Sequence, residues 1–245
     1  MDVVRVISLL LDYPTDELVA AKEDLKALVK PAPLSETTRG EMLQFIEKRC
    51  SGDLMEWQQD YDSLFERGRA LSLLLFEHVH GESRDRGQAM VDLMAEYRAA
   101  GLDIGVRELP DYIPLYLEFL STQGNENLQI GLADVAHILA VLCARLERRD
   151  SNYAVLFKGL IELSTAEIDM AAVHEQIKSE KRDDSKEAMD KVWEEEMVTF
   201  GPDSSGDGCS SGVSKPTPEQ SRQDHVPINW ANASDASKPT ATRGV

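Results

Sequence analysis

Apolar residues recur three and four positions apart through most of residues 1–200, and this spacing constrains the fold more than any other feature. The longest such run covers about residues 127–149 and ends in Arg145, Arg148 and Arg149, cations that suit the negative end of a helix dipole. The sequence has no sustained alternation of β-branched residues, which would indicate strands. We therefore predict an all-α fold, a single-domain helical bundle over residues 1–200.

Capping residues and helix breakers mark several helix ends. Thr15 can cap a helix at its N-terminus, and Gly101 can end another at its C-terminus. Asp184 with Glu187 resembles a capping box for a last helix. The predicted helices cover about residues 3–11, 15–30, 36–49, 53–66, 84–99, 109–120, 127–149, 152–166 and 184–193.

The composition of the chain changes at residue 201. Gly, Ser, Pro, Thr and Asn dominate residues 201–245, and few apolar residues remain there. Such a segment cannot bury enough apolar surface to offset the entropy cost of ordering. We predict a disordered C-terminal tail over residues 201–245, distinct from the helical domain of residues 1–200.

The chain is strongly acidic, with a formal net charge of −18. Residues 201–245 hold four Lys or Arg and five Asp or Glu, so nearly all of the excess acid belongs to residues 1–200. An acidic surface repels phosphate backbones, which argues against a nucleic-acid partner, and it attracts basic peptides. The alternative is that the acidity only keeps the protein soluble, and composition does not choose between the two.

Cysteine usage and hydropathy indicate the compartment. Cys50, Cys143 and Cys209 are far apart and form no Cys-x-x-Cys pair, so neither a disulfide framework nor a structural zinc site is indicated. The N-terminus has no cleavable apolar leader, and no apolar run reaches the roughly 20 residues that span a bilayer. We expect a soluble, cytoplasmic protein that does not insert into a membrane.

Residues 65–87 place many ionisable side chains beside a dense apolar run. Residues 71–76 lie between two blocks in which arginine, acid and glycine alternate, and His78 and His80 follow the run. In a helix, side chains two positions apart point about 200° away from each other, so these histidines could not share a metal ion there. In an extended segment they would face the same side, and Gly81 favours a break in the helix. We expect no metal site, and we expect local hydrogen bonds to satisfy the histidines at a helix end.

Four arginines in this segment have two possible roles. Because arginine pairs bidentately with phosphate, they could hold the phosphates of an anionic cofactor. Alternatively they pair with nearby acids and fix a helix junction, which is the role that we favour. The arginines are Arg67, Arg69, Arg84 and Arg86, and the acids are Glu66, Glu77, Glu82 and Asp85.

The sequence contains no recognisable enzyme motif. Gly-x-x-x-x-Gly-Lys-Ser/Thr and Gly-x-Ser-x-Gly are absent, and no strand precedes a glycine that could begin a dinucleotide fold. No pattern indicates an activated nucleophile with its base. We expect a protein that is not an enzyme and has no resident cofactor.

Several motifs of residues 1–200 resemble those of one family. They are residues 65–94, Leu9-Leu-Leu-Asp-Tyr-Pro14, Tyr61-x-x-Leu-Phe65, and parts of residues 107–118, 153–157 and 192–196. On these motifs the chain resembles the NarJ-type assembly chaperones of membrane-bound respiratory nitrate reductase, also called the nitrate reductase delta subunit family. Residues 201–245 take no part in the resemblance.

The resemblance implies an all-helical cytoplasmic chaperone. Its partner would be the apo catalytic (alpha) subunit of nitrate reductase, bound chiefly through the N-terminal region of that subunit. The chaperone would assist insertion of the molybdenum bis-guanine-dinucleotide cofactor before the enzyme docks on its membrane anchor. An alternative is a carrier that itself binds this cofactor through the four arginines named above.

The family's signature maps onto ten residues of this chain. We expect them to line or brace a groove for the client protein, with Glu77 and Glu82 as charges at its rim. The ten residues are Tyr61, Leu64, Phe65, Phe76, Glu77, His78, His80, Glu82, Pro110 and Asp111.

Overall fold

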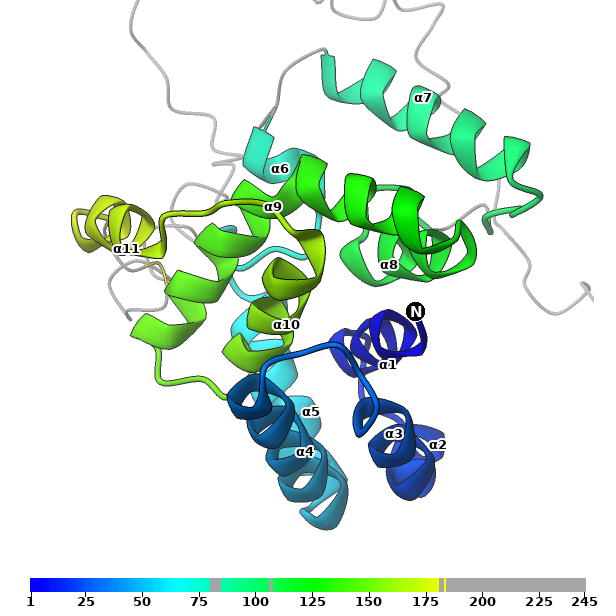
Figure 1. The fold of residues 1–245 in the computed structure, drawn as a ribbon. Helices are drawn as coiled ribbons and strands as arrows, with labels where there is room; N and C mark the ends of the chain where they lie inside the picture. The colour runs from blue at the N-terminus through cyan, green and yellow to red at the C-terminus, as the bar shows by residue number, and fades with distance from the viewer. Residues whose placement is uncertain (80–84, 106–107, 181–182, 184–245) are drawn as a thin grey trace, which may run out of the picture. The chain divides into compact units, whose positions relative to one another are not determined.

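The computed structural model describes residues 1–79, 85–105, 108–180 and 183, all of them within one contact unit of the chain. The predicted all-α fold is confirmed: these residues form helices, and their only strand-like pairing is an isolated bridge between Leu74 and Tyr112. The predicted tail and the last predicted helix, 184–193, lie outside the described residues. Figure 1 shows the arrangement of the helices.

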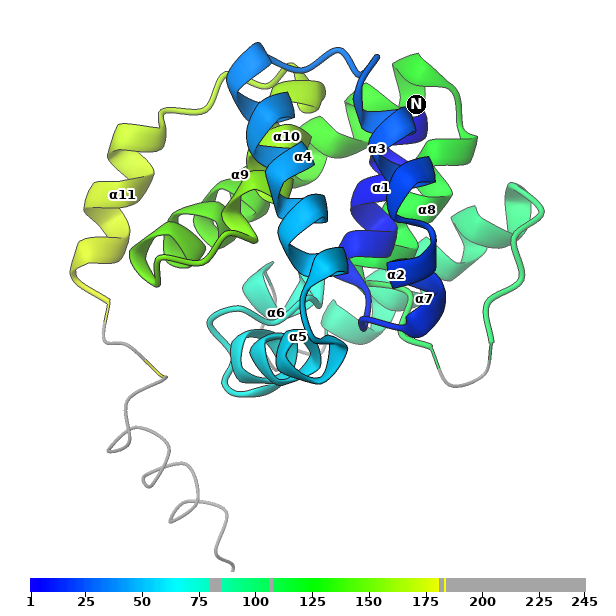
Figure 2. The same cartoon turned by 90° about the horizontal axis from the view of Figure 1, so that it is seen from below.

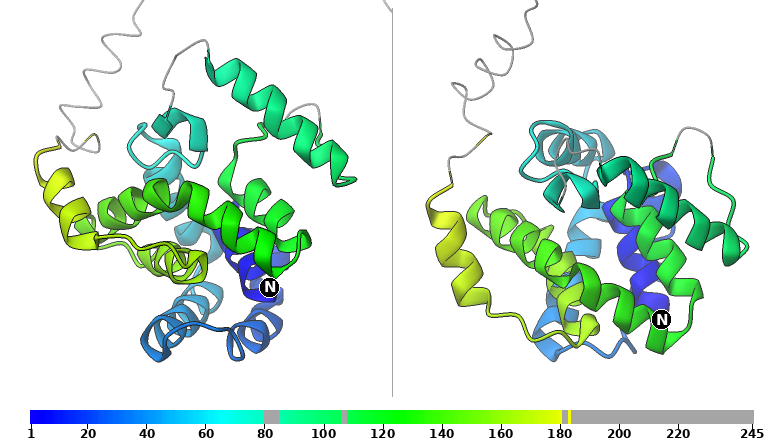
Figure 3. Two further views of the ribbon diagram at one scale, coloured as in Figure 1. Left: turned by 45° about the horizontal axis from the view of Figure 1, so that its top comes forward. Right: turned by 90° about the horizontal axis from the view of Figure 1, so that it is seen from above.

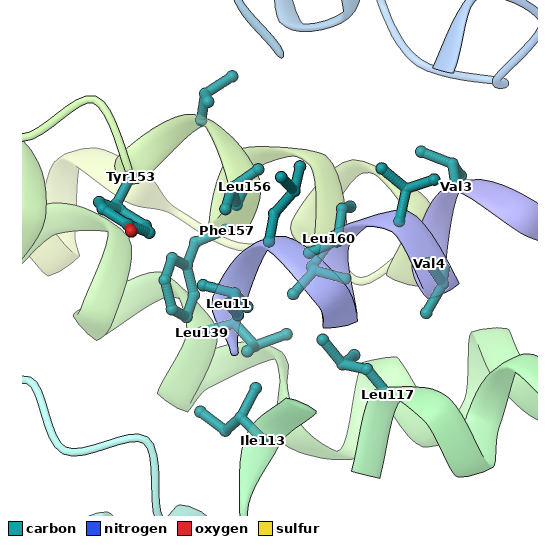
Figure 4. Close-up of a cluster of buried hydrophobic side chains, with 14 of the residues drawn as sticks. Val3, Val4, Leu11, Ile113, Leu117, Leu139, Tyr153, Leu156, Phe157 and Leu160 are labelled. Atoms are coloured by element: carbon teal, nitrogen blue, oxygen red, sulfur yellow. The ribbon is translucent and has the colours of Figure 1, made fainter. Parts of the chain in front are cut away.

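Four helices build the largest part of the core. The long α9 (Asn125–Arg148) packs against α10 (Ala154–Ser164), and α1 (Asp2–Leu11) packs against α8 (Ile113–Thr122). The side chains of α1, α8 and α10 meet in one apolar cluster, in which Val4, Leu117 and Leu160 are buried (Figure 4). Helices that are distant in sequence therefore share a single core.

The N-terminal helices pack on one another beside α1. The predicted helix over 15–30 is two helices, α2 (Asp16–Ala20) and α3 (Lys22–Val29), because the backbone at Ala21 leaves the helical conformation (φ −80°, ψ 6°). The predicted cap is confirmed, since the Thr15 side chain accepts a hydrogen bond from the Leu18 N–H. Across the interface with α4 (Glu36–Ser51), the Glu47 carboxylate accepts hydrogen bonds from Lys22 and Lys26, at 2.6 and 2.9 Å.

The middle of the chain forms shorter elements. The predicted helix over 53–66 is α5 (Leu54–Tyr61) followed by one π-helical turn, η1 (Asp62–Glu66). The segment after it forms α6 (Leu75–Val79) and then α7 (Asp85–Ala99), beyond which Gly101 has the expected left-handed conformation at φ +81°. Both views of Figure 3 show α7 beside α8, where the rings of Tyr97 and Phe119 lie 4.6 Å apart.

Two further elements differ from the prediction. The helix expected to start at residue 109 begins only at Ile113, because the residues before it form a turn. The helix α11 (Met170–Lys178), capped by Asp169, was not predicted, and it packs on α9 (Figure 2).

Helix α9 is long and apolar enough to cross a membrane, as judged by its length and composition alone. The expectation that no segment reaches that length was therefore wrong. However, α8, α10 and α11 contact α9 and bury residues along it, while Asp134 and His137 lie on its exposed side. Because an exposed carboxylate would be costly in lipid, we interpret α9 as a core helix of the bundle.

Candidate functional site

Five of the signature residues lie where α6 begins: Phe76, Glu77, His78, Pro110 and Asp111. Here residues 71–79 run beside residues 110–113, and we call these two segments the α6 junction. The Ile113 N–H donates to the Leu73 carbonyl at 2.8 Å, and the Leu75 N–H donates to the Asp111 carbonyl at 2.9 Å. These two bonds flank the bridge between Leu74 and Tyr112. The pairing explains why α8 starts late, because the backbone groups of Asp111 and Ile113 bond to Leu75 and Leu73 instead of continuing a helix toward residue 109.

Asp111 is the central polar residue of the α6 junction. It is fully buried, and its Oδ2 accepts a hydrogen bond from the Phe76 N–H at 3.1 Å, which satisfies a free donor in the first turn of α6. Burial raises the pKa of the Asp111 carboxyl, against the opposing effects of this bond and of Arg86. The guanidinium of Arg86 lies 4.0 Å from Asp111 and 3.7 Å from Glu77. Asp111 thus ties α6, α7 and the start of α8 together.

His78 makes the expected local hydrogen bond. Its Nε2 lies 2.8 Å from the carbonyl oxygen of Ser72, so this nitrogen carries the proton and donates. Burial lowers the pKa of His78 below its ordinary value of 6.5, although the Ser72 bond opposes the shift. Among the described residues no three His, Cys, Asp or Glu side chains are grouped as metal ligands would be. His80 lies outside the described residues.

The lowered pKa of His78 predicts a pH effect on stability. Because the unfolded chain binds the proton more readily than the folded chain, the contribution of His78 is present above pH 6.5 and is lost as pH falls through the folded pKa. We expect a fall from about pH 7.5 to about pH 5 to lower the free energy of unfolding less for His78→Gln than for the unsubstituted protein. The glutamine amide can still donate a hydrogen bond to the Ser72 carbonyl.

Urea unfolding at several pH values measures this difference, and His137→Gln, a substitution on the exposed side of α9, is the control. Parallel pH profiles for His78→Gln and the unsubstituted protein would contradict a lowered pKa of the half-buried His78 imidazole.

Tyr61 and Phe65 belong to a buried aromatic cluster. The Tyr61 ring lies 5.0 Å from Phe65 and 5.5 Å from Tyr13, and Phe65 lies 5.1 Å from Tyr153. Tyr61 is 1% exposed, and its hydroxyl donates to the Leu11 carbonyl at 3.1 Å. These contacts join α5 and η1 to α1 and to the start of α10.

The ten signature residues differ in their accessibility. Tyr61, Phe65, Pro110 and Asp111 are buried, which suits a bracing role. The half-buried members of the set are Leu64, Phe76, Glu77 and His78. Those outside the described residues are His80 and Glu82.

The four arginines are placed differently from one another. Arg86 pairs with Glu77, as expected for a residue that fixes a helix junction. Arg67 and Arg69 are exposed on either side of Gly68, and Arg84 lies outside the described residues.

The loop that carries Arg67 and Arg69 is held by the end of α9 and by Asp183. Asp183 accepts a hydrogen bond from the Ala70 N–H at 3.0 Å and pairs with Arg149. Arg145 donates to the Ala70 carbonyl at 2.8 Å. Gly68 has φ +93°, and a Cβ there would lie 2.4 Å from Asp183 Oδ2, so this turn requires glycine.

A groove between α1 and α8 was not predicted. It holds a cavity of about 220 Å³, and its walls include Arg5, Leu9, Asp12, Glu108, Leu115 and Glu118. At its floor the Ser8 hydroxyl donates to the Pro114 carbonyl at 2.7 Å, which holds the two helices together. Figures 2 and 3 show α1 and α8 side by side. One sequence signal could have indicated this groove: Leu9 lies outside the apolar face of the first helix and is exposed.

Comparison with known proteins finds relatives that match most of the chain. The model of the family described as "Nitrate reductase delta subunit" matches residues 31–158. The chain is 46% identical over 201 residues to the probable nitrate reductase molybdenum cofactor assembly chaperone NarW of Escherichia coli (strain K12), covering 82% of this chain and 84% of NarW.

Two further relatives have related names. The nitrate reductase molybdenum cofactor assembly chaperone NarJ of the same strain is 46% identical over 209 residues, which cover 85% of this chain and 87% of NarJ. The probable NarJ of Bacillus subtilis (strain 168) is 31% identical over 155 residues, which cover 63% of this chain and 84% of the relative.

Proposed function

The chain belongs to the nitrate reductase delta subunit family, and we propose that it is a chaperone that binds the apo catalytic subunit of nitrate reductase and assists molybdenum cofactor insertion. The observation that carries the proposal is the 46% identity to the assembly chaperone NarJ over 85% of this chain. Such a chaperone needs a surface for its client rather than a catalytic centre. We assign it a non-catalytic role in the cytoplasm, before the enzyme docks on its membrane anchor.

We further propose that the client is bound chiefly through the N-terminal region of the catalytic subunit. The net charge of −18 favours a basic segment, because opposite charge accelerates and orients the encounter. The half-buried Phe76, Glu77 and His78 are available to touch a client, whereas the buried Tyr61 and Asp111 brace the helices behind them. The signature thus divides into contact and brace residues.

The carrier alternative is not favoured. It requires free guanidinium groups that converge on phosphates, but Arg86 lies 3.7 Å from Glu77 and 4.0 Å from Asp111. Binding a cofactor phosphate there would separate a charge pair that is already formed. Molybdenum or guanine nucleotide that co-purifies with the chain alone would reverse this preference.

Co-purification with two forms of the catalytic subunit tests the proposed function. We expect the tagged full-length chain to retain the cofactor-free catalytic subunit and to release, or never bind, the cofactor-loaded subunit. The control is an unrelated acidic helical protein with the same tag. Failure to retain the apo subunit, or equal retention of both forms, would contradict the proposal.

A further inference from the structure

Helix α11 has little apolar packing to hold it on the bundle. It buries two of its nine residues, Val173 and Ile177, which pack on the small side chains of Ala140 and Ala144 of α9. Helix α10, which packs on the same helix, buries eight of its eleven residues. A helix as short as α11 is also unstable on its own. The position of α11 therefore depends on contacts other than apolar packing.

The C-terminal end of α9 supplies such contacts through its arginines. Arg145 pairs with the Glu180 carboxylate through two hydrogen bonds of 2.9 Å. Arg148 donates to the carbonyl oxygens of Ile177 and Glu180, at 2.7 and 3.1 Å. These carbonyls lie at the end of α11, where a helix leaves its last acceptors unsatisfied. Two arginines of α9 thus hold the C-terminal end of α11.

A third contact holds the middle of α11. His174 Nε2 donates to the Glu147 carboxylate of α9 at 2.6 Å, and the ammonium of Lys158 lies 2.9 Å from the same carboxylate. The side chains of these contacts are partly exposed, and salt screens charges at such positions. The attachment of α11 should therefore weaken as salt rises, whereas the apolar packing of α10 should not.

The chain on either side of α11 suits a hinged segment. Thr165, the exposed residue after α10, has the left-handed conformation at φ +58°, and residues 166–169 form no helix. Hinges are commonly a few residues at the end of an element. Beyond α11, Asp183 accepts from the Ala70 N–H at 3.0 Å and pairs with Arg149. Figures 1 and 2 show α11 beside α9 at the margin of the bundle.

We propose that residues 166–180, which we call the α11 strap, open as a unit about Thr165 while the rest of the bundle stays folded. Opening breaks the contacts with α9, uncovers the apolar side chains of Ala140 and Ala144, and draws Asp183 away from the Ala70 N–H. The loop that contains Ala70 leads into the α6 junction, so the strap is coupled to the segment that carries the family signature. The inference goes beyond the proposed function, and the chain alone suffices to test it.

Hydrogen exchange of the full-length chain at fixed pH, followed by mass spectrometry, measures this opening. We expect the amides of α11 to exchange at least about tenfold faster in about 1 M NaCl than in about 0.05 M NaCl, and those of α10 to change by less than about twofold. At low salt, Arg145→Gln/Arg148→Gln should accelerate the exchange of α11 about tenfold and reduce its salt dependence. Glu180→Gln, a change on the strap itself, should accelerate it about fivefold.

The matched control is Lys22→Gln/Lys26→Gln. It removes two cations from the interface of α3 with α4 and should leave the exchange of α11 unchanged. The exchange of α10 in each variant reports whether the bundle is folded, and Glu180→Gln tests the proposal even if the arginine variant does not fold. If α11 exchanged only as slowly as α10 at both salt concentrations, it would open only with the whole bundle, and the proposal would be overturned. Equal exchange of α11 in Glu180→Gln and the unsubstituted chain would also overturn it.

Discussion

Replacing Tyr61 with alanine should lower the free energy of unfolding by about 3–5 kcal/mol, the range seen when a buried aromatic side chain is truncated. The ring is 1% exposed and contacts Tyr13, Phe65 and Tyr153, so its removal leaves a cavity where α1, η1 and the start of α10 meet. Tyr61→Phe should recover most of the loss, because only the hydroxyl that donates to the Leu11 carbonyl is missing.

Tyr13 is the matched control for Tyr61. It forms the other half of an edge-to-face pair but is 44% exposed, so Tyr13→Ala should cost about 1 kcal/mol or less. Urea unfolding measures the stability of these variants, and titration with the apo catalytic subunit measures their binding. If Tyr61→Ala left stability unchanged but abolished binding, Tyr61 would be a client contact and not a brace.

Replacing Asp111 with alanine should cost about 1–3 kcal/mol, because the part-buried Phe76 N–H loses its acceptor. Asp111→Asn keeps an acceptor oxygen and should be milder. Since burial raises the pKa of Asp111, the folded chain holds the proton more tightly than the unfolded chain. The contribution of the carboxyl to stability is therefore fully present below its ordinary value of 3.8 and is lost as pH rises through the folded pKa.

This sign gives the Asp111 variants a distinctive pH profile. Between about pH 4 and about pH 7, the stability of Asp111→Asn should rise relative to that of the unsubstituted protein. Urea midpoints at each pH measure the difference, with the exposed Asp134→Asn as the control. If the stability of Asp111→Asn instead fell relative to that of the unsubstituted protein as pH rises, the charge of Arg86 would outweigh burial in setting the pKa of Asp111.

Apolar spacing, capping residues and glycines predicted those helices and helix ends that are determined by residues close together in the sequence. The apolar spacing of α9 and α10, the Thr15 cap and the left-handed Gly101 all follow from a few neighbouring residues. The break at Ala21 carries no glycine or proline, so nothing in the sequence marked it. The helix α11 was missed because its buried stripe consists only of Val173 and Ile177.

The candidate site depends on contacts between residues far apart in the sequence, which sequence patterns over a few neighbouring residues do not predict. Ile113 begins α8 because its N–H bonds to Leu73, a residue far back in the chain. Ser8 and Pro114, which hold the groove together, are 106 residues apart in the sequence. Most of the motif that carried the family resemblance lies at the α6 junction. The groove is lined by residues of α1 and α8, two helices that are far apart in the sequence and lie side by side in the structure (Figure 3).

Molybdenum content of the client enzyme tests the account most directly. Nitrate reductase is purified from cells that lack this chain and from the same cells supplied with it, and molybdenum is measured per catalytic subunit by elemental analysis. The account predicts a catalytic subunit that is made but largely free of molybdenum without the chain, and a loaded subunit when the chain is restored. Equal molybdenum content in both preparations would contradict it.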